Sequence, residues 1–148
     1  YCRALENEIL IKAFEQYHDF LITENIDKAT LLEADITNSD SKAYKFARFV
    51  KHNNSKYPLG DMKYILSLCK TAGKTYKASP LIQNFHEFLL KYFEDNIVQE
   101  EFLKSITNIV DNFRNKAAHP HLIDKANAIS FHSLIKECLT QFLDGYKK

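Results

Sequence analysis

An amphipathic run from Ile97 to Ala118 constrains the fold more than any other feature of this sequence. Its apolar residues recur every three or four positions, which matches one buried face of an α-helix. They are Val98, Phe102, Ile106, Ile109, Val110, Phe113 and Ala117. Pro120 follows the run, and proline both ends a helix and disfavours helical geometry in the residue before it. The pattern predicts a helix over 97–118 that packs one stripe against other elements.

Turn-forming residues are scarce, with three glycines and three prolines in 148 residues. Strand-rich folds need such residues often, so their scarcity indicates long helices and few turns. Eleven Phe and eight Tyr without any Trp predict a core built from aromatic rings. The apolar and charged contents, 45% and 26%, are typical of a globular domain with a sizeable core. We therefore expect an all-α bundle of about five to six helices.

Apolar spacing and capping residues predict the remaining helices. They are expected over 2–24, about 41–52, 61–72, 80–93 and 130–144, with a single helical turn at 27–34 and a start nearer 124 as the alternative for the last helix. Asp40 or Ser41 is expected to cap the second of these helices, Gly73 to follow the end of the third, and Ser79 to cap the fourth ahead of Pro80. No repeat or internal boundary is visible, so residues 1–148 are read as one domain. Because the chain begins at Tyr1, we expect it to be a fragment of a larger protein.

The cysteines and histidines do not form a recognisable metal site. Cys2, Cys69 and Cys138 are far apart and include no Cys-x-x-Cys pair, which speaks against a disulfide framework or a cysteine zinc site. Reduced thiols indicate a cytoplasmic protein. His119 and His121 are close, but no third ligand has a suitable spacing, so no metal or other cofactor is expected. No stretch has the length of a membrane span, and the N-terminus lacks a signal-peptide pattern, so no membrane association is expected.

Charge is distributed unevenly along the chain. Residues 42–77 contain nine Lys or Arg and one acid, whereas residues 1–41 contain three basic and nine acidic side chains. The basic stripe, which we define as Lys42, Lys45, Arg48 and Lys51, recurs every three residues along one flank of a predicted helix. Such a stripe attracts a phosphate backbone, which predicts RNA binding. The alternative is a solvated face that the acidic N-terminal part of the same molecule neutralises.

Two functional side chains stand at the end of the 97–118 run. Arg114 lies in its last turn, and His119 lies where the chain leaves it. At 100° per residue, Asp111 and Asn115 share one face of the helix, with Arg114 beside Asp111. The break at proline frees the imidazole to swing, so that Arg114 and His119 can meet one phosphate. The alternative is that both side chains only stabilise the helix end through its dipole.

The segment from Arg114 to His119, RNKAAH, resembles the signature of HEPN domains. In that family an Arg is followed by a His after four to six residues, often with a polar residue directly after the Arg. The resemblance implies a small all-α bundle with the motif at the junction of a late helix and its following loop, and a further helix after it. Many members are metal-independent ribonucleases of toxin, antiviral defence and CRISPR-associated systems, and others are inactive binding domains.

The chemistry that this resemblance implies uses the 2′-hydroxyl of RNA as the nucleophile. His119 would take the proton of that hydroxyl or protonate the leaving 5′-oxygen. Arg114 would hold the phosphate and the charge that grows in the transition state. Asn115 would position the phosphate or hold the imidazole, and Asp111 would orient Arg114 or the histidine. The products would be a 2′,3′-cyclic phosphate and a 5′-hydroxyl.

The resemblance also implies a homodimer, because two motifs of this family usually face each other and one motif supplies a single histidine. Further partners are expected among the other domains of the full-length protein or an antitoxin. A second interpretation is a catalytically inactive HEPN-like module for nucleic-acid or protein binding and dimerisation. A third is an unrelated helical interaction domain.

Overall fold

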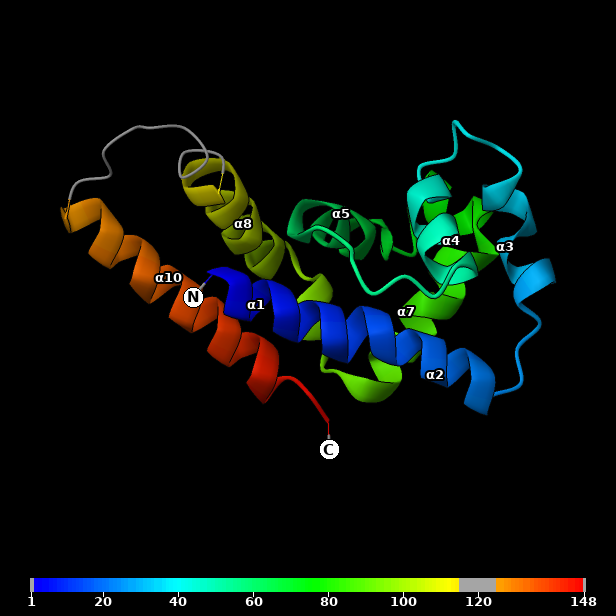
Figure 1. Cartoon of the computed structure of the whole chain (residues 1–148), viewed down its shortest axis with the longest axis horizontal. Coiled ribbons are helices and arrows are strands. Elements are labelled where there is room, and N and C mark those ends of the chain that lie inside the picture. The colour runs from blue at the N-terminus through cyan, green and yellow to red at the C-terminus, as the bar shows by residue number, and fades with distance from the viewer. Residues whose placement is uncertain (1, 115–124, 148) are drawn as a thin grey trace.

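The computed structural model describes residues 2–114 and 125–147, and for residues 113 and 114 the backbone alone (Figure 1). Regular structure in these ranges is helical, apart from an isolated antiparallel bridge between Phe93 and Tyr146. The α-helices are α1 (Cys2–Ile9), α2 (Gln16–Thr23), α3 (Lys28–Ile36), α4 (Tyr44–Lys51), α5 (Leu59–Leu68), α6 (Lys74–Ala78), α7 (Pro80–Tyr92), α8 (Glu100–Ile109) and α10 (Lys125–Asp144). The other helical segments are the π-helical η1 (Leu10–Glu15) and η3 (Val110–Arg114) and the 3₁₀ turn η2 (Asp95–Val98). The predicted all-α class is confirmed.

The first predicted helix is confirmed as a continuous rod made of α1, η1 and α2, which crosses the middle of the molecule (Figure 1). Its buried residues include Leu5, Ile9 and Tyr17. The π-helical segment carries Ala13 and Phe14, which are both fully buried although they are adjacent in sequence. A π turn holds an extra residue per turn, which lets two neighbouring side chains point into the core.

Aromatic rings fill the core between this rod, α4 and α7, as the composition predicted. Phe85 of α7 is at its centre, with its ring centroid 4.8 Å from that of Phe46, 5.0 Å from Tyr17 and 5.1 Å from Phe14. All four side chains are fully buried. Ring pairs at these separations contribute more than their buried area alone.

The same rod also packs against a second group of helices, α5, α8 and α10. In Figure 1, α8 and α10 lie at one end of the molecule, on either side of α1. Phe102 of α8 stacks with Phe142 of α10 at a centroid distance of 6.3 Å, and both are fully buried. This group of helices anchors the segment that carries the Arg114 motif.

Three local predictions were wrong. Neither Asp40 nor Ser41 caps the second predicted helix, because α4 begins at Tyr44 after Ala43 and has no side-chain cap. The expected single turn at 27–34 is the nine-residue helix α3, whose first turn is capped by Asp27 accepting a hydrogen bond from the Ala29 N–H at 3.1 Å. The expected end of a helix at Gly73 is instead the start of α6, because α5 already ends at Leu68 and Gly73 has an extended backbone. By contrast, Ser79 caps α7 ahead of Pro80 as predicted, with its Oγ accepting from the Ile82 N–H at 3.1 Å.

The helix expected over 97–118 is divided. The turn η2 precedes it, Gln99 is extended, and α8 begins at Glu100. After Ile109 the α-helix gives way to the π-helical η3, and residues 115–118 lie outside the described residues. The last helix takes the earlier of its two predicted starts, at Lys125.

Candidate functional site

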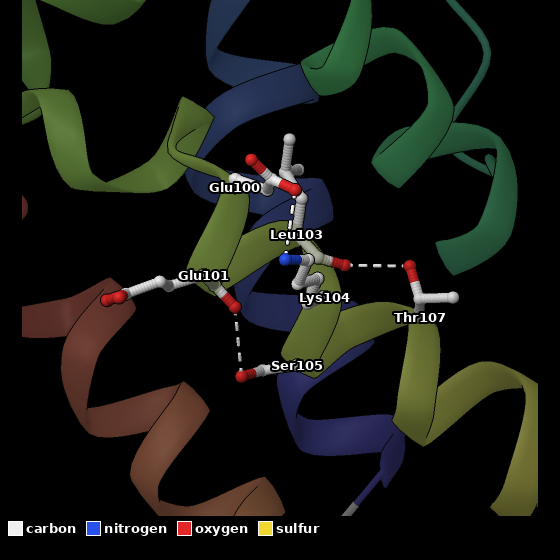
Figure 2. Close-up of polar contacts among 6 residues, drawn as sticks. All are labelled: Glu100, Glu101, Leu103, Lys104, Ser105 and Thr107. Carbon is white, nitrogen blue, oxygen red and sulfur yellow. Dashed lines mark hydrogen bonds and ion pairs between the residues drawn. The ribbon is translucent and has the colours of Figure 1, made fainter.

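Helix α8 is a firmly held support for the segment that follows it. Its buried face consists of Phe102, Leu103, Ile106 and Ile109. Figure 2 shows its other face, where contacts between residues four apart run along the helix. Lys104 Nζ lies 2.9 Å from Glu100 Oε1, and this contact lowers the pKa of the Glu100 carboxyl. The Thr107 hydroxyl donates to the Leu103 carbonyl at 2.8 Å, and the Ser105 hydroxyl donates to the Glu101 carbonyl at 3.1 Å.

The motif begins in the π-helical η3, and Arg114 occupies its last position. A π-helix bonds residues five apart, so its residues turn through less than 100° each. The backbone from Val110 to Arg114 is therefore not the regular α-helix on which the expected spacing of Asp111 and Arg114 was based. Asp111 is exposed to solvent, which is compatible with a contact to a bound molecule. The predicted Asn115 and His119 lie outside the described residues.

The first turn of α5 lies beside η3. A methyl group added at Gly60 would lie 3.9 Å from Val110 Cγ1, an ordinary packing distance. The Leu59 N–H, at the start of α5, donates to Glu6 Oε1 of α1 at 3.0 Å. An unpaired N–H at a helix start needs such an acceptor, and the Glu6 carboxylate is also favoured by the helix dipole. Glu6 thus joins the start of α5, which lies beside η3, to α1.

The basic stripe is a real surface feature. Lys45, Arg48 and Lys51 lie on the exposed side of α4, and Lys42 lies in the turn just before it. The opposite side of α4 is buried and consists of Phe46, Ala47, Phe49 and Val50. Lys45 Nζ is 3.7 Å from Asp61 Oδ1, and the Arg48 guanidinium lies 6.0 Å from the centroid of the Tyr44 ring. Three of the four cations therefore have no carboxylate partner among the described residues.

The acidic N-terminal part does not neutralise this stripe by direct contacts. Three of its carboxylates have other partners: Glu8 with Lys12, Glu24 with Lys91, and buried Asp35 with the hydroxyls of Ser41 and Ser79. Within residues 2–77, no ion pair joins an acid of the first 41 residues to a cation of the 42–77 segment. The alternative of an internally paired charged face is thereby weakened.

The stripe and the motif are adjacent through α5 but do not form one cluster. In Figure 1, α5 lies between α4 and α8. Asp61, in the first turn of α5, contacts Lys45, and its neighbour Gly60 packs beside Val110 of η3. Lys45 is thus the stripe residue that contacts the first turn of α5, which packs beside η3. Lys51 is at the far end, where α4 meets α3.

A surface hollow at this far end could not be found from the sequence. It has a volume of about 590 Å³ and is lined by Lys28, Ala29, Thr30, Leu32, Glu33, Ile36, Thr37 and Lys51. Six of these residues belong to α3, Thr37 follows its end, and Lys51 joins them from α4. The separation of Lys28 from Lys51 in sequence gives no signal that they share a site.

The described side chains include no group of three or more His, Cys, Asp or Glu that could hold a metal ion. None of the described helices combines the length and the apolar character that crossing a membrane requires. Comparison of the chain with protein-family models, with curated proteins and with solved structures finds no match.

Proposed function

We propose that this chain is a metal-independent endoribonuclease of HEPN type that works in the cytoplasm as part of a toxin or antiviral defence system. The observation that carries the proposal is the position of Arg114. It ends a helical segment that buried residues hold in place, and a long helix, α10, begins eleven residues after it, at Lys125. The family resemblance requires this order of a late helix, the motif and a further helix.

The surroundings of Arg114 support RNA as the substrate. The basic stripe approaches the motif through the first turn of α5, and three of its cations have no described carboxylate partner. A polyanion that contacts the stripe can therefore extend toward the end of α8. Within the proposal, Arg114 holds the phosphate that is cut, and His119 moves the proton of the 2′-hydroxyl. Asn115 and Asp111 orient these two groups.

The decisive experiment compares Arg114→Ala and His119→Ala with matched substitutions elsewhere. Arg3→Ala and His52→Ala change the same residue types on exposed parts of α1 and of the turn after α4. Each motif variant is expected to abolish RNA cleavage, and each control to retain it. Cleavage should persist in EDTA and end in a 2′,3′-cyclic phosphate, and a 2′-deoxy substitution at the cleaved position should block it.

Three outcomes would overturn this assignment. If EDTA stops cleavage, His119 and His121 must be reconsidered as metal ligands. If the protein cuts no RNA and both motif variants melt at clearly lower temperature, the motif is structural. If it cuts no RNA but binds RNA through the stripe, the inactive HEPN-like binding module is the better account. The three stripe cations without a described carboxylate partner are the observation that favours this second candidate.

A further inference from the structure

The hollow on α3 combines an apolar floor with a basic rim. Leu32 is 4% exposed, and Ile36 and Ala29 lie one turn to either side of it on the same helix face. Lys28 and Lys51 supply two cations, against one acid, Glu33. Binding sites for small molecules have this character, with volumes of a few hundred Å³, mostly apolar walls and a few polar groups.

Hydrogen bonds within the protein already occupy some of the polar groups of the hollow. Thr30 donates its hydroxyl to Asp27 Oδ2 at 2.6 Å, and Thr37 donates its hydroxyl to the Glu33 carbonyl at 2.7 Å. Lys28 Nζ donates to Asn53 Oδ1 at 2.8 Å. An ammonium group has three donors, so Lys28 retains two. The groups that are left to attract a ligand are therefore mainly cationic, which selects an anion.

Lys51 belongs both to this hollow and to the basic stripe. A chain of phosphates that contacts Lys45 and Arg48 along α4 therefore reaches the hollow at its end. A single-stranded nucleic acid matches both features. Its phosphates can follow the stripe, and one of its unpaired bases can fill the hollow. A duplex would keep its bases stacked inside and present only its backbone.

We propose that the α3 hollow is a subsite for one nucleotide of a single-stranded RNA, with the base against Ala29, Leu32 and Ile36 and the adjoining phosphate on Lys28 and Lys51. The subsite rests on RNA being the ligand, as in the proposed function, but not on cleavage. Its floor is aliphatic and it has no aromatic ring, so it accepts bases with little sequence preference. It would hold the RNA at a distance from the motif and so select strands with an unpaired segment.

The test observes the floor directly. The full chain carrying His119→Ala, which keeps RNA intact, is labelled on Ala, Leu and Ile methyl groups and titrated with a short oligouridylate. The methyl signals of Ala29, Leu32 and Ile36 are expected to shift. Inorganic polyphosphate and polyglutamate, which carry charge without bases, should shift them far less.

Substitutions test the rim and the floor separately. Lys51→Gln should weaken oligouridylate binding and lower its salt slope by about one unit. The control Lys136→Gln, on exposed α10, should change neither. Ala29→Glu should abolish the methyl shifts while the rest of the spectrum stays that of the folded chain.

Two results would overturn the subsite. One is that the methyl signals of Ala29, Leu32 and Ile36 do not shift at saturating RNA, and the other is that polyphosphate or polyglutamate shifts them equally. The two proposals can fail separately. Base-dependent shifts with a wild-type chain that cuts nothing would leave the subsite standing and remove the nuclease. RNA cleavage by the wild-type chain without shifts of these methyl signals would leave the nuclease standing and remove the subsite.

Discussion

His18 is a buried ionisable residue with little to stabilise its charge. It is 8% exposed, its ring stacks on Phe49 at 4.9 Å, and neither ring nitrogen has a hydrogen-bond partner among the described residues. Burial lowers the pKa of His18, the backbone of Asn54 and the Asp19 carboxylate oppose this effect, and nearby Lys28 adds to it. The neutral imidazole is therefore the form that the folded protein favours.

The stability of the protein should consequently fall in mild acid. The unfolded chain takes up a proton on His18 near pH 6.5, whereas the folded chain resists it until its lower pKa is reached. The free energy of unfolding is thus fully retained above pH 6.5 and declines as the pH falls through that window, by at most about 1.4 kcal/mol per pH unit for this group. His86 has a lowered pKa through burial and contributes with the same sign.

Urea unfolding between pH 5 and 8 measures this effect. His18→Phe, which keeps a ring beside Phe49, should flatten the pH dependence, and the exposed control His52→Gln should leave it unchanged. If His18→Phe leaves the pH dependence of the free energy of unfolding unchanged, burial of the His18 ring does not disfavour its protonation.

At the scale of elements, Ser79 links three parts of the chain. Its hydroxyl accepts from the Ile82 N–H to cap α7 and donates to the buried carboxylate of Asp35 at 2.6 Å. Asp35 is at the end of α3 and also accepts from Ser41, in the turn before α4. One buried carboxylate thus fixes the starts of two helices relative to a third.

Ser79→Ala should be clearly destabilising, because it removes a helix cap and leaves a buried carboxylate with one hydroxyl fewer. We expect a loss of about 1–3 kcal/mol in the free energy of unfolding, measured by urea titration. Ser67→Ala is the matched control, since its hydroxyl donates only to an exposed carbonyl within α5. Equal effects of the two substitutions would contradict this role of Ser79.

The sequence predicts an element well when the residues that determine it are neighbours in the chain. Ser79 followed by Pro80 is a local signal, so the start of α7 is predicted correctly. A glycine at the end of a helical pattern does not say whether it ends one helix or begins the next, and Gly73 does the latter. The π turns η1 and η3 depart from the regular period of 3.6 residues, so an apolar periodicity does not predict them.

The same distinction between neighbouring and distant residues applies to the candidate site. The motif and the basic stripe follow from spacing within one segment, and the exposure of the stripe agrees with that prediction. The contact of Gly60 with Val110, and the meeting of Lys28 with Lys51, join residues that are far apart in the chain. Only the three-dimensional arrangement reveals them.

At the scale of the whole molecule, the resemblance predicts a homodimer centred on the 97–118 segment and the 119–123 turn. The first half of α10 lies at the same end of the molecule as η3 and exposes Ile129, which is 58% accessible (Figure 1). An apolar side chain so exposed near the expected interface is a natural contact for the second copy.

Sedimentation velocity at micromolar concentration should give a dimer, and Ile129→Glu should shift it toward monomer. Ile22→Glu is the matched control, because Ile22 is 67% exposed at the end of α2, away from α8 in Figure 1. A wild-type monomer would count against both the dimer and a site shared between two motifs.

The uneven burial of α10 has a consequence for amide hydrogen exchange. Its buried residues Ile135, Cys138 and Phe142 all lie in the second half, whereas residues 125–130 are all exposed. The first turns of this helix should therefore open and take up deuterium without global unfolding, while the second half exchanges only when the core does. If a second copy covers the first half, its deuterium uptake should slow as the protein concentration rises, so the exchange rate of one helix reports on assembly.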